Sequence, residues 1–524
     1  MLRRPCILFS AAASGLLLTA AFPKVEWEFL AWFALVPFGL ALRRLKPGEA
    51  FRFGWITGWV HFLSLLYWLV PTMRIYGKLP AALSVFILLI FCAFLALFIA
   101  LVAWSLSRLA PTPLRAALWF PVIWVAAEYV RTFIFTGFPW ALLGYSQYRH
   151  RYLIQLADLT GVYGLSYLIA AANAAIILIL ATAMRLEWQR SPVSWRTTAA
   201  ASMTAILILG AALFYGHHRL VEMDRSLASA SKIKVAAIQG NIDQSDKWDD
   251  AYKIKTIDIY NRLSAGIGAA APELIVWPET AAPFYFMVEK EPTLRVLAGI
   301  RKSGSTFLIG SPSVRKREGT YEFHNSAWLV DGDGSLRAKY DKAHLVPFGE
   351  YTPFKEWLPF LGKIVAQVGD FVPGEKGHVV SWDGRGLGIQ ICYEIIFPYL
   401  ARAQTRNGAD LLVNITNDAW YGRTSGPFQH FSMVVLRAVE NRRALVRAAN
   451  TGISGFVDPD GRITLSTGLF EEAAVAGELP LLETRTVYTR YGDLFAGACL
   501  IAAIAGIIAT WALSRKRGAR QSPG

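Results

Sequence analysis

Eight long apolar runs constrain this chain more than any other feature of its sequence. They lie at 5–22, 26–43, 53–71, 80–106, 115–135, 162–184, 198–216 and 493–513. A helix that crosses the hydrocarbon core of a bilayer needs about 20 mostly apolar residues. We therefore predict a polytopic α-helical membrane domain of about eight transmembrane helices. Seven belong to residues 1–216, one belongs to residues 493–524, and a polar segment at 217–492 separates them.

Basic loop residues predict the orientation of these helices. Arginines and lysines precede the first run and follow the second, fourth, sixth and last runs. All of these positions lie on one side if every run crosses the membrane, and positive loop residues favour the cytoplasm. We expect both termini to be cytoplasmic and the segment 217–492 to face outward. Only the basic loop at 149–151 opposes this pattern.

Composition agrees with a membrane protein and gives no reason to expect a nucleic-acid partner. The chain is 54% hydrophobic and 17% charged, whereas soluble domains carry about 25% charged residues. Its net charge of +15 is interpreted as a topology signal, because the basic residues cluster beside apolar runs. Cys392 is the single cysteine of the polar segment, since Cys6, Cys92 and Cys499 lie in apolar runs. It has neither a local disulfide partner nor the spacing of a zinc site.

Two charged residues interrupt the fifth apolar run near its outer end. Glu128 and Arg131 lie one helical turn apart. Charges at membrane depth are costly and often functional. A simple i, i+3 pair at the membrane interface is the alternative interpretation.

The polar segment has the pattern of a layered α/β domain. After a polar linker at 217–231, strands are predicted at 233–242, 273–277, 306–314, 325–330, 336–341, 388–392, 410–416, 445–450 and 454–458. The strand at 306–314 is predicted to be interrupted at Gly310-Ser311-Pro312. Helices are predicted at 250–267, 294–303 and 428–441. A segment of about 250 residues is large enough to form its own core.

Three polar residues stand at the ends of predicted strands: Glu279, Lys342 and Cys392. α/β proteins tend to bind ligands at the carboxyl ends of their strands. A thiolate is a nucleophile for acyl transfer, a carboxylate can move its proton, and an ammonium can stabilise an oxyanion. Each residue also has a structural interpretation: a buried apolar cysteine, an acid at a helix start and a surface cation. Their occurrence together in one domain favours catalysis.

The motifs around these residues resemble a known superfamily. W-P-E, Y-x-K-x-H-L-V-P-F-G-E and I-C-Y-E are similar to the motifs of the nitrilase (carbon–nitrogen hydrolase) superfamily, which has a Glu-Lys-Cys triad and an αββα sandwich fold. With its membrane runs, nearly the whole chain resembles the apolipoprotein N-acyltransferase family of bacterial inner membranes. The resemblance implies a membrane domain at 1–216, a nitrilase-like periplasmic domain at 217–492 and a C-terminal transmembrane helix with a basic cytoplasmic tail at 493–524.

The resemblance also implies residue roles. Glu279 matches the general base, Lys342 the oxyanion-stabilising cation and Cys392 the acylated nucleophile. The matching supporting positions are a second essential glutamate, the two residues after the nucleophile, an aromatic residue near the site and an asparagine: Glu350, Tyr393, Glu394, Trp248 and Asn325.

The implied reaction has two halves. Cys392 takes a fatty acyl chain from a membrane phospholipid, preferentially phosphatidylethanolamine, and a lysophospholipid leaves. The resulting thioester then acylates the N-terminal α-amine of a diacylglyceryl-cysteine apolipoprotein, which is the last step of lipoprotein maturation. The resemblance implies no metal ion and no organic cofactor.

An apolar, aromatic segment at 351–371 suggests a further element. It contains Phe354, Trp357, Phe360 and Leu361. Long apolar loops are often lids or membrane contacts, although large apolar side chains can also simply cover a core. We hypothesise that this segment lies at the lipid interface and gates the site.

Two other functions remain open at this point. A membrane-tethered amidase would share the triad but transfer the acyl group to water, and a single helix would suffice as its tether. A membrane scaffold or transporter would carry a non-catalytic outer domain, but the intact triad and the absence of clear paired half-repeats in the sequence disfavour it.

Overall fold

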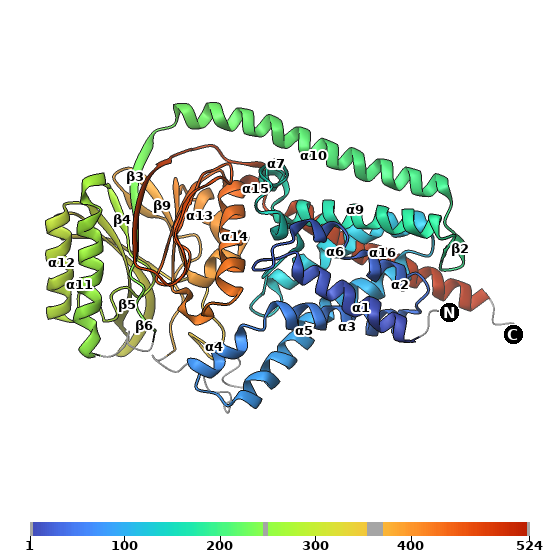
Figure 1. Ribbon diagram of the computed structural model, residues 1–524, viewed down its shortest axis with the longest axis horizontal. Coiled ribbons are helices and arrows are strands. Elements are labelled where there is room, and N and C mark those ends of the chain that lie inside the picture. The colour runs from blue at the N-terminus through green and yellow to red at the C-terminus, as the bar shows by residue number, and fades with distance from the viewer. Residues whose placement is uncertain (1–3, 245–249, 354–369, 521–524) are drawn as a thin grey trace. The chain divides into compact units, whose positions relative to one another are not determined.

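The computed structural model describes residues 4–244, 250–353 and 370–520 (Figure 1). Two features of the sequence interpretation lie outside these residues. One is Trp248, the predicted aromatic residue of the site. The other is the centre of the predicted lid, with Phe354, Trp357, Phe360 and Leu361.

The chain divides into two units. The helical unit comprises Met1–Tyr67, Val85–His218 and Asp493–Gly524, and the α/β unit comprises Trp68–Ser84 and Arg219–Gly492. This division differs from the ranges expected from sequence order in one segment, because Trp68–Ser84 packs with the α/β unit. The predicted linker at 217–231 is also different in the structure, since most of it is helical.

Mostly apolar helices build the helical unit. Its longer helices are α1 (Arg4–Ala20), α2 (Val36–Leu42), α3 (Pro47–Leu65), α5 (Ala81–Leu109), α6 (Pro113–Phe133), α9 (Val162–Ala183), α10 (Trp195–Ser229) and α16 (Leu494–Arg520). Its short elements are η1 (Glu28–Trp32), η2 (Leu143–Gln147), α7 (Arg151–Ile154), α8 (Ala157–Thr160), β1 (Glu187–Trp188) and β2 (Ser191–Pro192). Small residues let neighbouring helices approach closely. A Cβ on Gly58 of α3, for example, would lie 2.8 Å from the Cα of Ala96 in α5.

The prediction of several apolar helices is confirmed, but the count of about eight membrane spans is not. Among the described residues, four helices are long and apolar enough to cross a membrane: α5, α9, α10 and α16. A fifth candidate is the broken pair of α3 and α4 (Leu69–Ile75). The first two apolar runs give the shorter helices Pro5–Ala20 and Glu28–Leu42. The fifth run forms α6, which contains Arg115, Glu128 and Arg131.

Two six-stranded sheets form the centre of the α/β unit. The first sheet contains, in spatial order, β14 (Ala473–Pro480), β3 (Lys232–Gln239), β4 (Leu274–Val276), β5 (Thr306–Arg317), β6 (Thr320–Val330) and β7 (Leu336–Asp341). The second sheet contains β13 (Ile463–Ser466), β12 (Gly455–Val457), β11 (Ala444–Ala449), β10 (Leu411–Thr416), β9 (Arg385–Ile391) and β8 (Val380–Trp382). Strands β3, β4 and β5 run parallel to one another, as do β9, β10 and β11.

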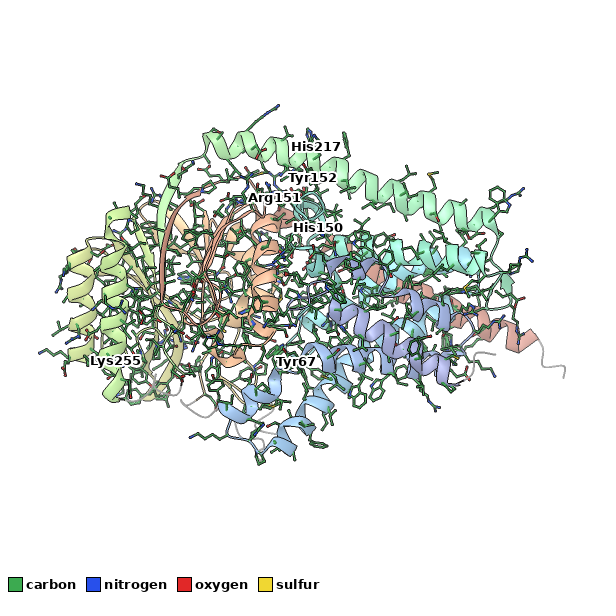
Figure 2. All side chains as sticks on the ribbon, viewed as in Figure 1. Tyr67, His150, Arg151, Tyr152, His217 and Lys255 are labelled. Carbon is green, nitrogen blue, oxygen red and sulfur yellow. The ribbon has the colours of Figure 1, made fainter. Side chains whose placement is uncertain are left out.

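Helices cover the outer faces of the two sheets (Figure 1). These helices are α11 (Asp250–Gly266), α12 (Lys290–Ser303), α13 (Pro398–Arg406) and α14 (Gly426–Asn441). Buried apolar side chains such as Val276 and Val413 join the facing sides of the sheets. A second cluster, with Ile257 and Val296, packs α11 and α12 on the first sheet. The α/β unit is therefore an αββα sandwich, filled by the side chains drawn in Figure 2.

The short elements η3 (Gly268–Ala270), η4 (Cys392–Ile396), η5 (Asp418–Tyr421) and α15 (Val487–Tyr491) complete the α/β unit. Strand β5 corrects one prediction, because it continues through Gly310-Ser311-Pro312 and pairs with β6 along its length. Its pairing with β4 ends at Leu308. Beyond that point one side of β5 is an edge, where a proline that lacks an N–H group is tolerated.

Candidate active site

The predicted strand-end residues lie at the ends of observed strands. Glu279 is the third residue after β4, Lys342 directly follows β7, and Cys392 directly follows β9. The first two belong to the first sheet and Cys392 belongs to the second sheet. Because the two sheets face each other across a shared core, side chains from both meet at one place.

Four predicted site residues form one hydrogen-bonded group. The Lys342 Nζ lies 2.9 Å from Glu350 Oε1 and 3.6 Å from Glu279 Oε1. The Asn325 Nδ2 donates to both of these carboxylate oxygens, at 2.8 Å each. Asn325 comes from β6, and Glu350 comes from the loop after β7. The asparagine therefore joins the two carboxylates that flank the ammonium.

The ammonium of Lys342 is fully surrounded, with 1% of its side chain exposed. Burial alone would lower its pKa, but the negative charges of Glu350 and Glu279 raise it above the usual value. Lys342 is thus a fixed cation at neutral pH. A fixed, buried cation is suited to stabilise negative charge that develops on a reacting oxygen.

Backbone groups hold the two carboxylates in place. The amide of Val346 donates to Glu350 Oε2 at 2.8 Å, and the amide of Asn417 donates to Glu279 Oε2 at 3.0 Å. Gly310 of β5 allows the Glu279 backbone to lie close to the sheet. A Cβ at position 310 would lie 2.3 Å from the carbonyl oxygen of Pro278 and 2.7 Å from the Cα of Glu279.

Cys392 occupies a strained turn between β9 and η4. Its φ angle is 53°, in the left-handed region that residues other than glycine rarely adopt. Burial raises the pKa of its thiol well above the usual range, and the Glu279 carboxylate raises it further, while Lys342 lowers it. The resting group is therefore a protonated thiol. A nearby base must take its proton before it can attack.

Glu394 links the two sheets from its place two residues after Cys392. Its carboxylate accepts hydrogen bonds from the amides of Ala343 at 2.8 Å and His344 at 3.0 Å, which follow Lys342. It also accepts from the Tyr340 hydroxyl at 3.0 Å and from the Ile391 amide at 2.7 Å. Burial raises the pKa of this carboxyl to about 7, against the effect of its backbone donors. Glu394 thus fixes the Lys342 loop to the cysteine turn.

The other predicted residue after the nucleophile, Tyr393, packs among aromatic rings. Its ring centroid lies 5.1 Å from that of Phe397 and 6.0 Å from that of His344. Tyr393 is 8% exposed.

Sequence reasoning missed a buried polar network next to the cysteine. Asp418 accepts a hydrogen bond from the Thr416 hydroxyl at 3.0 Å and one from Arg447 at 2.7 Å. The Nδ1 atom of His430 lies 3.0 Å from Asp418 Oδ1. Arg447 also donates to Asn414. All five side chains are fully buried, so the network is internal to the second sheet and α14.

This network acts on the charge state of Cys392. Burial would raise the pKa of Asp418, but the charge of Arg447 holds it below its usual range. The resulting carboxylate raises the pKa of the Cys392 thiol, whereas a hydrogen bond with Thr416 lowers it. A signal for this network was present in the sequence, since Asn417-Asp418 directly follows the predicted strand at 410–416.

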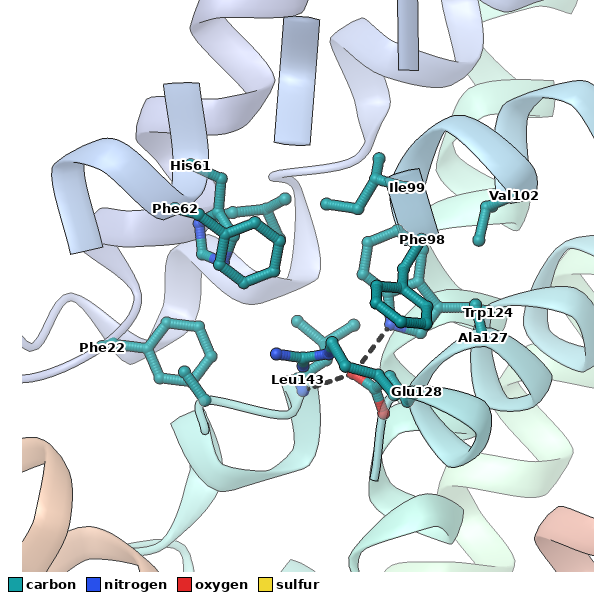
Figure 3. A pocket seen from close by; sticks show the side chains of 13 residues that line it. Phe22, His61, Phe62, Phe98, Ile99, Val102, Trp124, Ala127, Glu128 and Leu143 are labelled. Atoms are coloured by element: carbon teal, nitrogen blue, oxygen red, sulfur yellow. Dashed lines mark hydrogen bonds between the residues drawn. The ribbon is translucent and has the colours of Figure 1, made fainter. Parts of the chain in front are cut away.

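Glu128 and Arg131 lie in the helical unit and do not form the predicted interface pair. Both are buried, at 6% and 5% exposed, and within the described residues they form no ion pair with each other. Glu128 Oε1 instead accepts from Trp124 at 3.0 Å and from the Leu143 amide at 2.7 Å. These residues border a mainly apolar cavity of about 30 Å³ (Figure 3).

No group of three or more potential metal ligands occurs among the residues that the structure describes.

Comparisons with known proteins match both parts of the chain. Residues 14–175 match the apolipoprotein N-acyltransferase N-terminal domain, and residues 234–488 match the carbon-nitrogen hydrolase family. The chain is 45% identical to an apolipoprotein N-acyltransferase of Geobacter metallireducens, over 97% of this chain and 95% of that protein. It is 34% identical to one of Azotobacter vinelandii, over 99% and 97%. It is also similar to a solved amidase from Nesterenkonia sp., with 24% identity and a TM-score of 0.38, over 51% of this chain and 95% of that one.

Proposed function

This chain belongs to the apolipoprotein N-acyltransferase family, and from that premise we propose that Glu279, Lys342 and Cys392 carry out its acyl transfer. The family performs the last step of lipoprotein maturation, so the chain is an N-acyltransferase. The observation that carries the proposed residue roles is the buried contact of Lys342 with Glu279 and Glu350.

The first half-reaction loads the enzyme. Glu279 takes the thiol proton as the Cys392 sulfur attacks the carbonyl carbon of a phospholipid ester. Negative charge develops on the carbonyl oxygen, where the Lys342 ammonium stabilises it. The carbon–oxygen ester bond then breaks, and Glu279 returns the proton to the departing lysophospholipid alkoxide. A thioester on Cys392 remains.

The second half-reaction transfers the acyl chain from Cys392 to the acceptor. The N-terminal α-amine of a diacylglyceryl-cysteine apolipoprotein attacks the thioester carbon, and Glu279 takes the amine proton. Lys342 stabilises the second oxyanion. The carbon–sulfur bond then breaks, the Cys392 sulfur regains a proton from Glu279, and an amide is formed. The charges of the resting site are restored, so the cycle can repeat.

The supporting residues keep this geometry through both halves. Asn325 and Glu350 hold Lys342 between the carboxylates, and Glu394 holds the Lys342 loop against the cysteine turn. Tyr393 borders the acyl group. Groups locked by surrounding hydrogen bonds need little reorganisation when charge develops.

The donor and the membrane arrangement complete the proposal. The donor is a phospholipid of the phosphatidylethanolamine type, and the acceptor is membrane-anchored through its diacylglyceryl group. All eight apolar runs cross the bacterial inner membrane. Both termini are cytoplasmic, and the α/β unit faces the periplasm. The basic loops support this orientation, because positive residues favour the cytoplasmic side.

A transfer assay tests the proposal. The full-length protein is incubated in detergent micelles with phosphatidylethanolamine and a synthetic diacylglyceryl-cysteine peptide, and products are identified by mass spectrometry. We expect an N-acylated peptide, which disappears in Cys392→Ser and Glu279→Gln. The conservative variant of a surface acid, Glu322→Gln, should leave the yield unchanged.

The same assay distinguishes the amidase alternative. Release of free fatty acid in place of the acylated peptide would show transfer to water. Acylation of the peptide by Cys392→Ser at the native rate would refute the proposed nucleophile.

A further inference from the structure

One segment from the N-terminal half of the sequence is built into the α/β unit. Residues Trp68–Ser84 lie between apolar helices in sequence but pack with the α/β unit. The segment contains α4, Leu69–Ile75. Its contacts are directed to η5, the short helix Asp418–Tyr421 that follows β10.

Three side chains of this segment hydrogen-bond to η5 and its neighbour α14. The Thr72 hydroxyl donates to the carbonyl of Trp420 at 2.7 Å, and the Tyr76 hydroxyl donates to the carbonyl of Ala419 at 2.9 Å. The Trp68 indole donates to Gln429 at 3.2 Å.

Aromatic contacts accompany these hydrogen bonds. The Trp68 ring meets the Tyr421 ring edge-on at 4.8 Å, and the Tyr76 ring meets the Trp420 ring edge-on at 4.9 Å. Edge-on rings at this separation attract each other. The segment thus holds η5 by two backbone carbonyls and two ring pairs.

η5 in turn holds groups of the proposed active site. The residue that caps its start, Asn417, donates its amide to Glu279 Oε2 at 3.0 Å. The first residue of η5, Asp418, accepts the Thr416 hydroxyl and the Arg447 guanidinium. Tyr421, at its end, faces His430 of the same network at 5.7 Å. A shift of η5 would therefore move the hydrogen bond donor of the base.

We propose that Thr72 and Tyr76 are positioning residues for the acyl transfer, which act through η5 on the Asn417–Glu279 hydrogen bond. This inference rests on the proposed role of Glu279. Neither hydroxyl needs to touch a substrate. They fix two consecutive carbonyls of η5, so the amide of Asn417 stays aimed at the carboxylate while Glu279 takes and returns protons. Small displacements of a reacting group can cost about 100-fold in rate.

The position of this segment in the sequence determines which parts of the chain the proposed active site requires. Thr72 lies in α4 and Tyr76 directly follows this helix, in the N-terminal half of the sequence, whereas Glu279 and Cys392 lie in its C-terminal half. The proposed active site is thus complete only when the N-terminal half contributes its segment. An α/β unit expressed without residues 1–218 would lack these two hydroxyls.

The test measures acyl-enzyme formation on the full-length protein at several phosphatidylethanolamine concentrations in detergent micelles. The variants are Thr72→Val, Tyr76→Phe and their combination, which remove hydroxyls and keep the side-chain shapes. The rescue variant is Thr72→Ser, which keeps the hydroxyl. The matched control is Thr320→Val with Tyr321→Phe, the same changes at exposed positions of β6.

We expect the combined variant to lose about tenfold in the maximal acylation rate. The lipid concentration at half-maximal rate should stay within about twofold of the native value, and Thr72→Ser and the β6 control should keep the native rate. If the combined variant does not fold, the single Tyr76→Phe variant serves for the same comparison of maximal rate with half-saturating lipid concentration. We then expect the maximal acylation rate to fall about threefold.

An unchanged maximal rate in the variants would overturn the inference. So would a loss that appears only as a higher half-saturating lipid concentration, because the segment would then be a lipid-binding surface. Absence of acyl-enzyme on the native protein is a separate outcome, which would refute the proposed function itself.

Discussion

The two sheets of the α/β unit contribute to the proposed site in opposite ways. The first sheet supplies charges that face one another directly: Glu279, Lys342 and Glu350, joined by Asn325. The second sheet supplies one uncharged thiol, Cys392, and keeps its charges behind it in the Asp418–Arg447 pair. In the proposed mechanism, the first sheet holds the groups that move protons and stabilise charge, and the second holds the group that forms the covalent bond.

This difference explains how a protonated thiol and a fixed cation can coexist. A cation beside a thiol lowers the pKa of the thiol, but the carboxylates of Glu279 and Asp418 and burial all raise it. The cysteine therefore stays neutral until Glu279 takes its proton. We therefore expect variants of the first-sheet charges to change proton transfer and oxyanion stabilisation, and variants of the network behind Cys392 to change mainly stability.

Removal of the cation should give the largest effect. In Lys342→Met, two buried carboxylates would face each other without a counter-charge, and the oxyanion would lose its stabiliser. We expect acyl-enzyme formation to fall about 10³-fold and the fold to lose about 3–5 kcal/mol, seen as a lower thermal unfolding midpoint.

The control for this variant is Lys339→Met, in the same strand. Lys339 forms a partly exposed ion pair with Asp341 at 3.0 Å, and such pairs contribute about 0–1 kcal/mol. Equal losses for Lys339→Met and Lys342→Met would contradict the special position of Lys342.

The link between the two sheets is the next target. In Glu394→Gln, a carboxylate that accepts four hydrogen bonds becomes an amide. The NH₂ group of this amide would face hydrogen-bond donors and could not accept from them. We expect a loss of about 2–3 kcal/mol, because at least one buried donor is left unsatisfied. Thermal unfolding followed by tryptophan fluorescence measures this loss. A variant as stable as the native protein would show that the two sheets do not depend on this bridge.

The reactivity of the Cys392 thiol, in the second sheet, reports on the charge of Glu279 in the first sheet. In Glu279→Gln the pKa of Cys392 should fall, because the negative charge of Glu279, which raises the pKa of the thiol, is removed. Alkylation by iodoacetamide at pH 8 should then become roughly threefold faster or more, since more thiolate is present. Acyl-enzyme formation should fall in the same variant, because the base is lost. Equal alkylation rates in variant and native protein would contradict the coupling of the two groups.

The smallest effect is expected from the network behind the cysteine. Burial and the charge of Arg447 lower the pKa of His430, so the folded state excludes a proton that the unfolded state binds below about pH 6.5. Stability is therefore complete above that pH and falls on acidification, by at most about 1.4 kcal/mol for each pH unit. His430→Asn should flatten this dependence, whereas His378→Asn, at a partly exposed position, should not. An unchanged slope in His430→Asn would exclude His430 as its source.

The sequence predicts the first sheet better than the second for a physical reason. Glu279 and Lys342 follow recognisable strands, so their strand-end position and their chemistry can both be inferred. Arg447 instead lies in the middle of β11, and His430 lies in a helix that is buried on nearly every face. Charged residues are rarely buried, so a pattern-based interpretation places such residues at the surface.

Three other features required the three-dimensional arrangement. The contact of residues 68–76 with η5 joins segments more than 300 positions apart, which no local pattern can indicate. The number of candidate spans is lower than eight because the first two apolar runs form shorter helices, and because the fifth run forms α6, which carries Arg115, Glu128 and Arg131. Strand β14 was also missed, since its pairing with β3 joins the two ends of the α/β unit.

The most direct test of the central claim is intact-mass analysis of the protein after incubation with phosphatidylethanolamine alone. With no acceptor present, the first half-reaction should stop at the thioester. The account predicts a fatty-acyl mass increment that hydroxylamine removes, that is absent from Cys392→Ala and that forms far more slowly in Glu279→Gln. A hydroxylamine-sensitive increment that persists in Cys392→Ala, or no increment on the native protein, would contradict it.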